Sequence, residues 1–246
     1  MNIGLFGLAL LSAGALFASV LAAVAGFGGA AVLLPILVLV FGVRDAIPIL
    51  TVAQLIGNGS RVWFNRRELK LRVVGWFSLG GIPSALIGGM LFASAPLVYL
   101  NRLLGLFLLL IVVYRHMKGS HFERMPLRGF APLGAVSSFL CALLGSVGPL
   151  MAPFFLSYGL VKGAYIGTEA LATVVMHVTK LIAYGSTSLL TVDNIVVGVA
   201  LGPLMVLGSF LGKKIVDQIS ESLFVWIIEA TMVIAGFGLL LHRSGF

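Results

Sequence analysis

Charged residues are scarce in this sequence. Only 10% of its 246 residues are Asp, Glu, Lys or Arg, whereas a soluble domain carries about 25%. Hydrophobic residues make up 60% of the chain, and its mean hydropathy is +1.13. A water-soluble fold would leave much of this apolar surface in contact with water. We therefore exclude a soluble protein and expect a chain embedded in a lipid bilayer.

Cysteine is nearly absent as well, and so are the motifs of enzymes. The single cysteine, Cys141, lies inside an apolar segment, so neither an intrachain disulfide nor a zinc-type spacing of cysteines is available. The chain has no HExxH or Gly-x-Ser-x-Gly sequence, no phosphate-binding loop and no paired acidic metal motif. We expect a protein that is not an enzyme and that holds no metal or other cofactor.

Long apolar segments separated by short polar connections occupy the whole chain. A helix needs about 20 apolar residues to cross the roughly 30 Å hydrocarbon core of a bilayer. Eight segments are long enough, and the second and the seventh are too short. The segments span residues 3–24, 28–42, 46–64, 73–93, 97–114, 129–145, 147–160, 164–185, 194–212 and 222–241. This pattern predicts an all-α polytopic membrane protein.

The two halves of the sequence resemble each other. A glycine-containing break followed by a proline, a glycine and a threonine occurs first at residues 26–29, Pro35, Gly42 and Thr51, and again at residues 145–148, Pro153, Gly159 and Thr168. Farther on, Pro83 and Gly88 match Pro203 and Gly208, and the offset stays between 117 and 120 positions. The sequence therefore predicts a duplicated unit of about five segments, with residues 1–125 and 126–246 as the two repeats of one membrane domain.

The distribution of basic residues predicts the orientation of the repeats. Basic connections at residues 66–72, 115–128 and 213–214 are expected in the cytoplasm, and the connections at 93–96 and 185–193, which have no basic residue, outside. Equivalent connections of the two halves then lie on opposite sides of the membrane. We predict inverted repeats with both termini outside, and we attribute the net charge of +8 to topology and not to nucleic-acid binding.

The two glycine-containing breaks are candidate binding elements. Inverted halves with interrupted helices are typical of secondary transporters, which bind substrate near the membrane midplane. Gly28, Gly29 and Gly148 lie where new helices begin, and glycine allows close approach of the backbone to a ligand. The free N–H groups of a helix start favour an anion. Glycine also serves close packing of membrane helices, so both roles stay open.

Polar residues on two otherwise apolar segments complete the predicted site. Thr51, Gln54, Asn58 and Arg61 share one face of segment 46–64, and segment 164–185 carries Thr168, Glu169, Thr173, His177 and Lys180, the last four on a common face. Ionisable residues inside a membrane are functional candidates, although a long lysine can also reach the interface. We predict that Thr51, Gln54, Asn58, Thr168, His177 and Lys180 bind substrate with the three glycines, and that Glu169 exchanges a coupling proton.

The motifs also resemble a known family. Residues 26–29 with Pro35 and the helix around 46–51, repeated at 145–148, Pro153 and 163–168, resemble the TauE/SafE family of sulfite exporters over essentially the whole chain. The resemblance implies a permease of the bacterial cytoplasmic membrane for small anions such as sulfite, sulfoacetate or related sulfonates.

These observations together predict a secondary transporter of small anions. We expect alternating access and proton coupling, with a small anionic substrate and the lipid bilayer as partners, and we leave a homo-oligomer open. A cation carrier or channel is an alternative, because Glu169 and Glu229 could serve a cation. Another alternative is a membrane subunit or membrane enzyme that transports nothing.

Overall fold

The computed structural model describes residues 5–27, 29–92, 125–145, 147–227 and 230, and every regular element in this part of the chain is a helix. The elements are α1 (Leu5–Ala25), α2 (Gly29–Phe64), α3 (Leu71–Leu91), the 3-10 turn η1 (Leu127–Gly129), α5 (Phe130–Leu144), α6 (Gly148–Ser157), α7 (Lys162–Ser186), α8 (Val192–Ala200) and α9 (Gly202–Gln218). Four stretches are long and apolar enough to cross a membrane, namely Gly7–Ala25, Leu71–Leu91, Lys162–Ser186 and Val192–Gln218. The prediction of an all-α, multi-pass membrane protein is confirmed.

Two predicted segments are joined in one helix, and one predicted segment is divided. Helix α2 contains the predicted segment 28–42 from Gly29 onward and the whole segment 46–64, and Gly42 interrupts it with a non-helical conformation (φ 75°, ψ 164°). The segment predicted at 194–212 consists of α8 and α9, which meet at Leu201. The segment predicted at 97–114 lies outside the described residues, and most of 222–241 does too. The full number of crossings and the inverted orientation therefore stay predictions.

The two short segments both follow a sharp turn at a glycine. Gly26 and Gly145 end the preceding helices with φ values of 81° and 80°, a left-handed conformation that residues with a side chain adopt only at a cost. Helix α6 has 10 residues, so at 1.5 Å per residue it is about 15 Å long, half the thickness of the hydrocarbon core. Each glycine therefore ends one helix and lets a new helix begin inside the protein.

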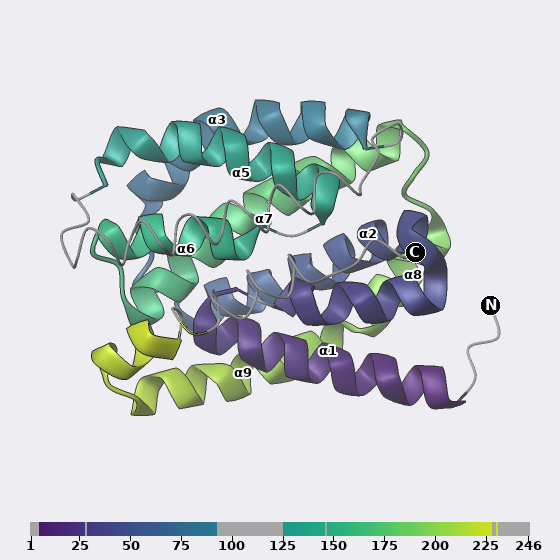
Figure 1. Ribbon diagram of the computed structural model, residues 1–246, viewed down its shortest axis with the longest axis horizontal. Coiled ribbons are helices and arrows are strands. Elements are labelled where there is room, and N and C mark those ends of the chain that lie inside the picture. Colours follow the sequence, from purple (N-terminus) through teal and green to yellow (C-terminus); the bar gives the residue numbers. More distant parts are fainter. Residues whose placement is uncertain (1–4, 28, 93–124, 146, 228–229, 231–246) are drawn as a thin grey trace.

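Helices α2 and α7 run through the middle of the molecule (Figure 1). The pair α3 and α5 lies on one side of them, and the pair α1 and α9 lies on the other. In terms of the predicted repeat, the first helix of each half packs against the fourth segment of the other half, since α1 contacts α9 and α5 contacts α3. The central pair is thus enclosed by both halves.

Small residues allow the outer pairs to approach closely. At Gly134 of α5, a Cβ atom would collide with the Phe77 carbonyl of α3. At Gly212 of α9, a Cβ atom would lie 3.0 Å from the Val20 carbonyl of α1. Such glycines let helix backbones touch, which is how helices associate where lipid provides no hydrophobic drive.

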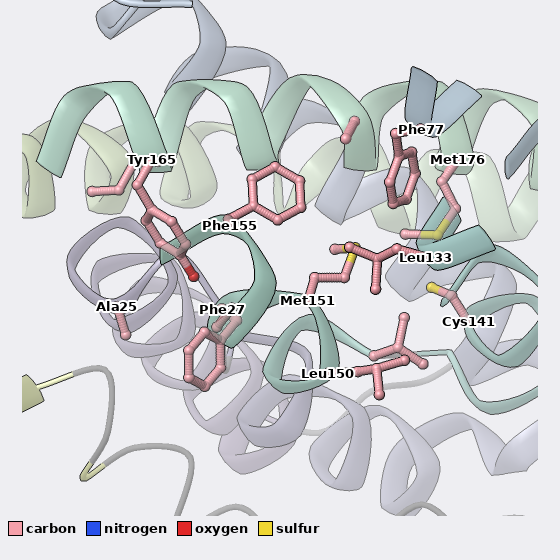
Figure 2. Close-up of a cluster of buried hydrophobic side chains, with 14 of the residues drawn as sticks. Ala25, Phe27, Phe77, Leu133, Cys141, Leu150, Met151, Phe155, Tyr165 and Met176 are labelled. Carbon is pink, nitrogen blue, oxygen red and sulfur yellow. The ribbon is translucent and has the colours of Figure 1, made fainter. Parts of the chain in front are cut away.

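A buried aromatic cluster holds the short helix α6 in place (Figure 2). The ring of Phe155 on α6 meets the ring of Tyr165 on α7 edge to face, with centroids 6.3 Å apart, and it meets Phe130 of α5 at 5.0 Å. Phe27, in the connection between α1 and α2, belongs to the same cluster. The first break and the second short helix are therefore packed against one core.

Candidate functional site

A small cavity lies where the two breaks meet the central helices. Its volume is about 40 Å³, and residues of α1, α2, α5, α6 and α7 line it. A single water needs about 10–15 Å³ on this measure, so the cavity has room for a few waters or a small ion. Both Gly26 and Gly145, the turning residues of the two breaks, belong to the lining. The cavity is thus formed jointly by the two predicted halves.

The structure brings most of the predicted binding residues to this cavity. Six of them line it, namely Gly29, Gln54, Asn58, Gly148, Glu169 and His177. Thr51, Thr168 and Lys180 are buried but do not line it. Gly28 and Glu229 lie outside the described residues. The polar faces of α2 and α7, which were predicted separately, therefore face a common space.

The side chains of Thr51 and Thr168 form hydrogen bonds with backbone groups instead of lining the cavity. The Thr51 hydroxyl donates to the carbonyl of Ile47 within α2 at 2.8 Å. The Thr168 hydroxyl accepts a hydrogen bond of 3.0 Å from the backbone N–H of Lys70. That bond ties the start of α7 to the basic connection before α3.

Gly29 and Gly148 serve packing as well as lining. A Cβ atom on Gly29 would lie 2.7 Å from the Ala18 carbonyl, and one on Gly148 would collide with the side chain of Phe27. Helix α2 begins at Gly29 and α6 at Gly148, so the free N–H groups of two helix starts lie at the cavity. Of the two roles left open by the sequence, packing is observed at both glycines, and ligand binding stays a prediction.

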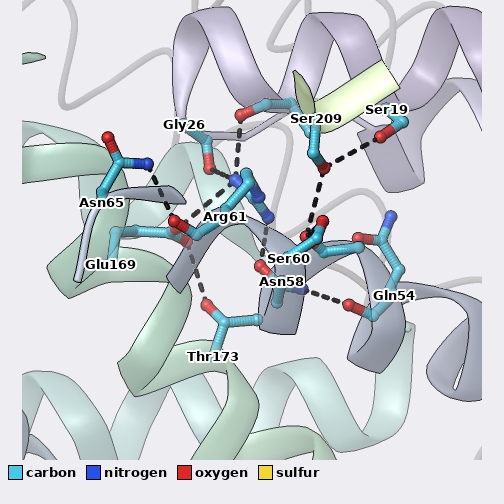
Figure 3. A network of polar contacts seen from close by, with 12 residues as sticks. Ser19, Gly26, Gln54, Asn58, Ser60, Arg61, Asn65, Glu169, Thr173 and Ser209 are labelled. Atoms are coloured by element: carbon cyan, nitrogen blue, oxygen red, sulfur yellow. Dashed lines mark hydrogen bonds and ion pairs between the residues drawn. The ribbon is translucent and has the colours of Figure 1, made fainter. Parts of the chain in front are cut away.

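Arg61 is the central polar residue of the site, although the sequence analysis left it out of the binding set. One guanidinium nitrogen, Nη1, donates to the carbonyls of Ala22 at 2.9 Å and Gly26 at 2.8 Å, and Nη2 donates to Asn58 Oδ1 (Figure 3). Arg61 therefore caps the C-terminal end of α1, where the helix dipole favours a cation. The sequence signal that could have identified Arg61 was its position three residues after Asn58, on the same helical face.

Glu169 is the only carboxylate among the described cavity-lining residues. Its Oε1 accepts from the Thr173 hydroxyl at 3.0 Å. Its Oε2 lies 3.6 Å from Arg61 Nη1 and has no hydrogen-bond partner in the described part of the chain. That distance gives an ion pair without a hydrogen bond. One oxygen of a buried carboxylate is thus free to take a proton.

Lys180 lies one layer behind the cavity. Its ammonium donates to the Cys141 thiol at 3.6 Å and lies 5.7 Å from the centre of the Tyr184 ring. The side chain is completely buried, and no carboxylate of the described residues lies within 4 Å of it. His177 is also buried, and its Nδ1 has no partner among the described residues.

Among the described residues, basic side chains outnumber acidic ones at the cavity and directly behind it. Arg61 and Glu169 line the cavity, and Lys180 lies behind Cys141, which also lines it. Helix starts at the cavity add partial positive charge. The described residues contain no group of three or more His, Cys, Asp or Glu side chains that could hold a metal ion. The arrangement is therefore suited chemically to an anion.

Comparison with known proteins adds one match. The family model described as sulfite exporter TauE/SafE matches residues 11–239. No curated protein and no solved structure matches the chain. The matched range contains both breaks and every residue that lines the cavity.

Proposed function

This chain belongs to the sulfite exporter TauE/SafE family, and on that premise we propose that it is a secondary transporter of small oxyanions such as sulfite or organosulfonates. The family is one of membrane transporters, which agrees with the multi-pass helical fold. The observation that carries the proposal is the cavity between the two breaks, with Arg61 at its wall and an excess of positive charge around it.

The charges at the cavity favour an anion over a cation. An oxyanion that enters meets the guanidinium of Arg61 and the helix starts at Gly29 and Gly148. Guanidinium groups bind such oxygens through short charge-assisted hydrogen bonds. A cation in the cavity would meet the guanidinium of Arg61 beside the single carboxylate of Glu169, with Lys180 behind the wall. The cation alternative is therefore less consistent with this site than an anion.

Glu169 couples substrate binding to a proton in this proposal. A substrate anion and the ionised Glu169 carboxylate compete for Arg61. When the anion binds Arg61, the Glu169 carboxylate loses its counter-ion. The ionised form is unfavourable in a site of low dielectric, so Glu169 takes up a proton. Other titratable groups near Glu169 are Tyr165 and His177 on the same helix, Cys141 on α5, which lines the cavity, and Lys180 behind it. Binding of the anion should therefore tighten as the pH falls.

Alternating access would operate through the two halves. Residues 1–125 and 126–246 are proposed as inverted repeats, with both termini outside a bacterial cytoplasmic membrane. Reciprocal contacts of α1 with α9 and of α5 with α3 support this proposal, as do the two glycine turns with equal φ. The midplane site would then open to either side as the halves rock against each other.

Transport by the purified protein in proteoliposomes tests the proposal. Uptake of sulfite, sulfoacetate and a carboxylate should be compared at two pH values, for wild type and for Glu169→Gln. Glu68→Gln is the control, because Glu68 is an exposed carboxylate in the connection after α2. We expect saturable anion uptake that responds to a proton gradient, loss of that response only in Glu169→Gln, and anion exchange retained.

Each other outcome has a distinct meaning. Uptake that keeps its proton dependence in Glu169→Gln would remove this residue from coupling and leave the carrier. Saturable uptake of a cation with no anion uptake would support the cation alternative. Absence of any transport by correctly folded protein would support the non-transport alternative, in which partner-binding or reactive residues lie at the membrane surface.

A further inference from the structure

Several residues around the cavity repeat at an offset of 119 positions, within the range of 117 to 120 that relates the two halves. Three matched pairs separated by 119 positions are Gly26 and Gly145, Asn58 and His177, and Arg61 and Lys180. The members of these pairs line the cavity with the sole exception of Lys180. At this offset Lys180 is the counterpart of Arg61 in the second half, whereas Thr51 and Thr168 on the same two helices match at 117.

The two cations also occupy equivalent places in the fold. Arg61 bonds the carbonyls of Ala22 and Gly26, at the end of the helix that precedes the first break. The residue matched with Ala22 is Cys141, at the end of the helix that precedes the second break. Lys180 lies against this residue, 3.6 Å from its thiol. Each cation thus stands beside the helix end of its own half.

The partners of the two cations differ. Arg61 donates hydrogen bonds to two backbone carbonyls and to the side-chain amide oxygen of Asn58, and it forms an ion pair with the Glu169 carboxylate. Lys180 has a thiol, which is a weak acceptor, and an aromatic ring 5.7 Å away. Lys180 has no counter-ion within the part of the chain that the structure describes, and a completely buried ammonium group in that state is expensive in a membrane protein. Such a group is expected to gain a negative partner at some stage of its working cycle.

We propose that Lys180 is the reciprocal of Arg61, the cation that binds the transported anion when the cavity faces the opposite side of the membrane. The inference rests on the proposed anion transport. In the described conformation Arg61 lines the cavity and Lys180 rests on Cys141 behind it. In the opposite conformation Lys180 reaches the anion, and Arg61 stays at the end of α1.

Measurement of transport from each side of the membrane tests this role. The half-saturating sulfoacetate concentration should be measured with the ligand on either side of oriented proteoliposomes, for wild type, Arg61→Gln and Lys180→Gln. We expect Lys180→Gln to raise the half-saturating concentration on one side of the membrane, and Arg61→Gln to raise it on the other side. Each increase should be at least about tenfold, which is the loss expected for one charge-assisted hydrogen bond. Lys162→Gln, outside the cavity at the start of α7, is the control.

A structural role of Lys180 would give a different result. If its charge only stabilises the fold, Lys180→Gln will change both sides equally, and the inference is overturned. Lys180→Arg keeps the charge and provides a second variant if Lys180→Gln does not fold; it should retain transport from both sides. Wild type that transports no anion would refute the proposed function itself, whereas active wild type with an unaffected Lys180→Gln refutes only this inference.

Discussion

The exchange of Arg61 for glutamine tests the site most directly. Arg61→Gln removes the donors to the Ala22 and Gly26 carbonyls and leaves Glu169 without the guanidinium 3.6 Å away. Arg61 is 4% exposed and Glu169 is 2% exposed, so bulk water has little access to the groups that lose a partner. Loss of one partner of a buried ion pair lowers the free energy of unfolding by about 3–5 kcal/mol. We expect this variant to be severely destabilised.

Glu169→Gln removes the same ion pair at a smaller cost. Arg61 keeps its hydrogen bonds to two carbonyls and to Asn58, and no carboxylate remains without a counter-ion. The double variant should therefore be more stable than Arg61→Gln alone. Residues in one such network typically show a coupling energy of about 0.5–3 kcal/mol. For anion binding, the loss of a charged hydrogen bond of about 1.5–3 kcal/mol corresponds to roughly 10- to 150-fold weaker affinity.

Thermal unfolding of the purified variants in detergent, with anion uptake in proteoliposomes, measures both effects. Arg66→Gln is the matched control, since Arg66 is exposed and bonds only the Trp63 carbonyl, at 3.0 Å, among its hydrogen bonds in the described chain. It should behave as wild type. An Arg61→Gln protein with unchanged stability and unchanged anion affinity would refute the reasoning. A double variant whose destabilisation equals the sum of the two single effects would show that the pair is not coupled.

Two further predictions concern glycines, and the thermal unfolding midpoint checks both. Gly26→Ala and Gly145→Ala each place a side chain at a φ near 80°, which costs about 1–2 kcal/mol in both variants. At Gly26 the added Cβ also collides with the ring of Tyr165. Gly26→Ala should therefore have the lower midpoint, and equal midpoints would show that the ring yields freely. Gly134→Ala should lower the midpoint because its Cβ would collide with a carbonyl of α3. Gly75→Ala should not lower it, because no atom of another described element lies within 4 Å of the Cβ that it adds. An unchanged midpoint in Gly134→Ala would mean that α3 and α5 can separate without loss of stability.

Sequence patterns identified the faces of the site better than its members. The polar stripe with Gln54 and Asn58 and the stripe with Glu169 and His177 were both predicted, and all four residues line the cavity. Arg61 was visible on the first stripe but was not included in the predicted binding set. Its bonds to two carbonyls of α1 depend on how α1 and α2 pack, and helical periodicity contains no information on that packing.

Composition and hydropathy determined that this is a helical membrane protein, and the glycine pattern predicted the turns at Gly26 and Gly145. Both properties follow from the local sequence, from its hydropathy and from the conformational freedom of glycine. The family was indicated by the resemblance of the two motifs and shown by the family model. Only the tertiary structure decided that Thr168 bonds a loop, that Glu169 meets Arg61 and that Lys180 rests on Cys141. Each of these contacts joins residues at least 39 positions apart, and the packing angle and depth of whole helices, not the pattern on any one of them, select the side chains that meet.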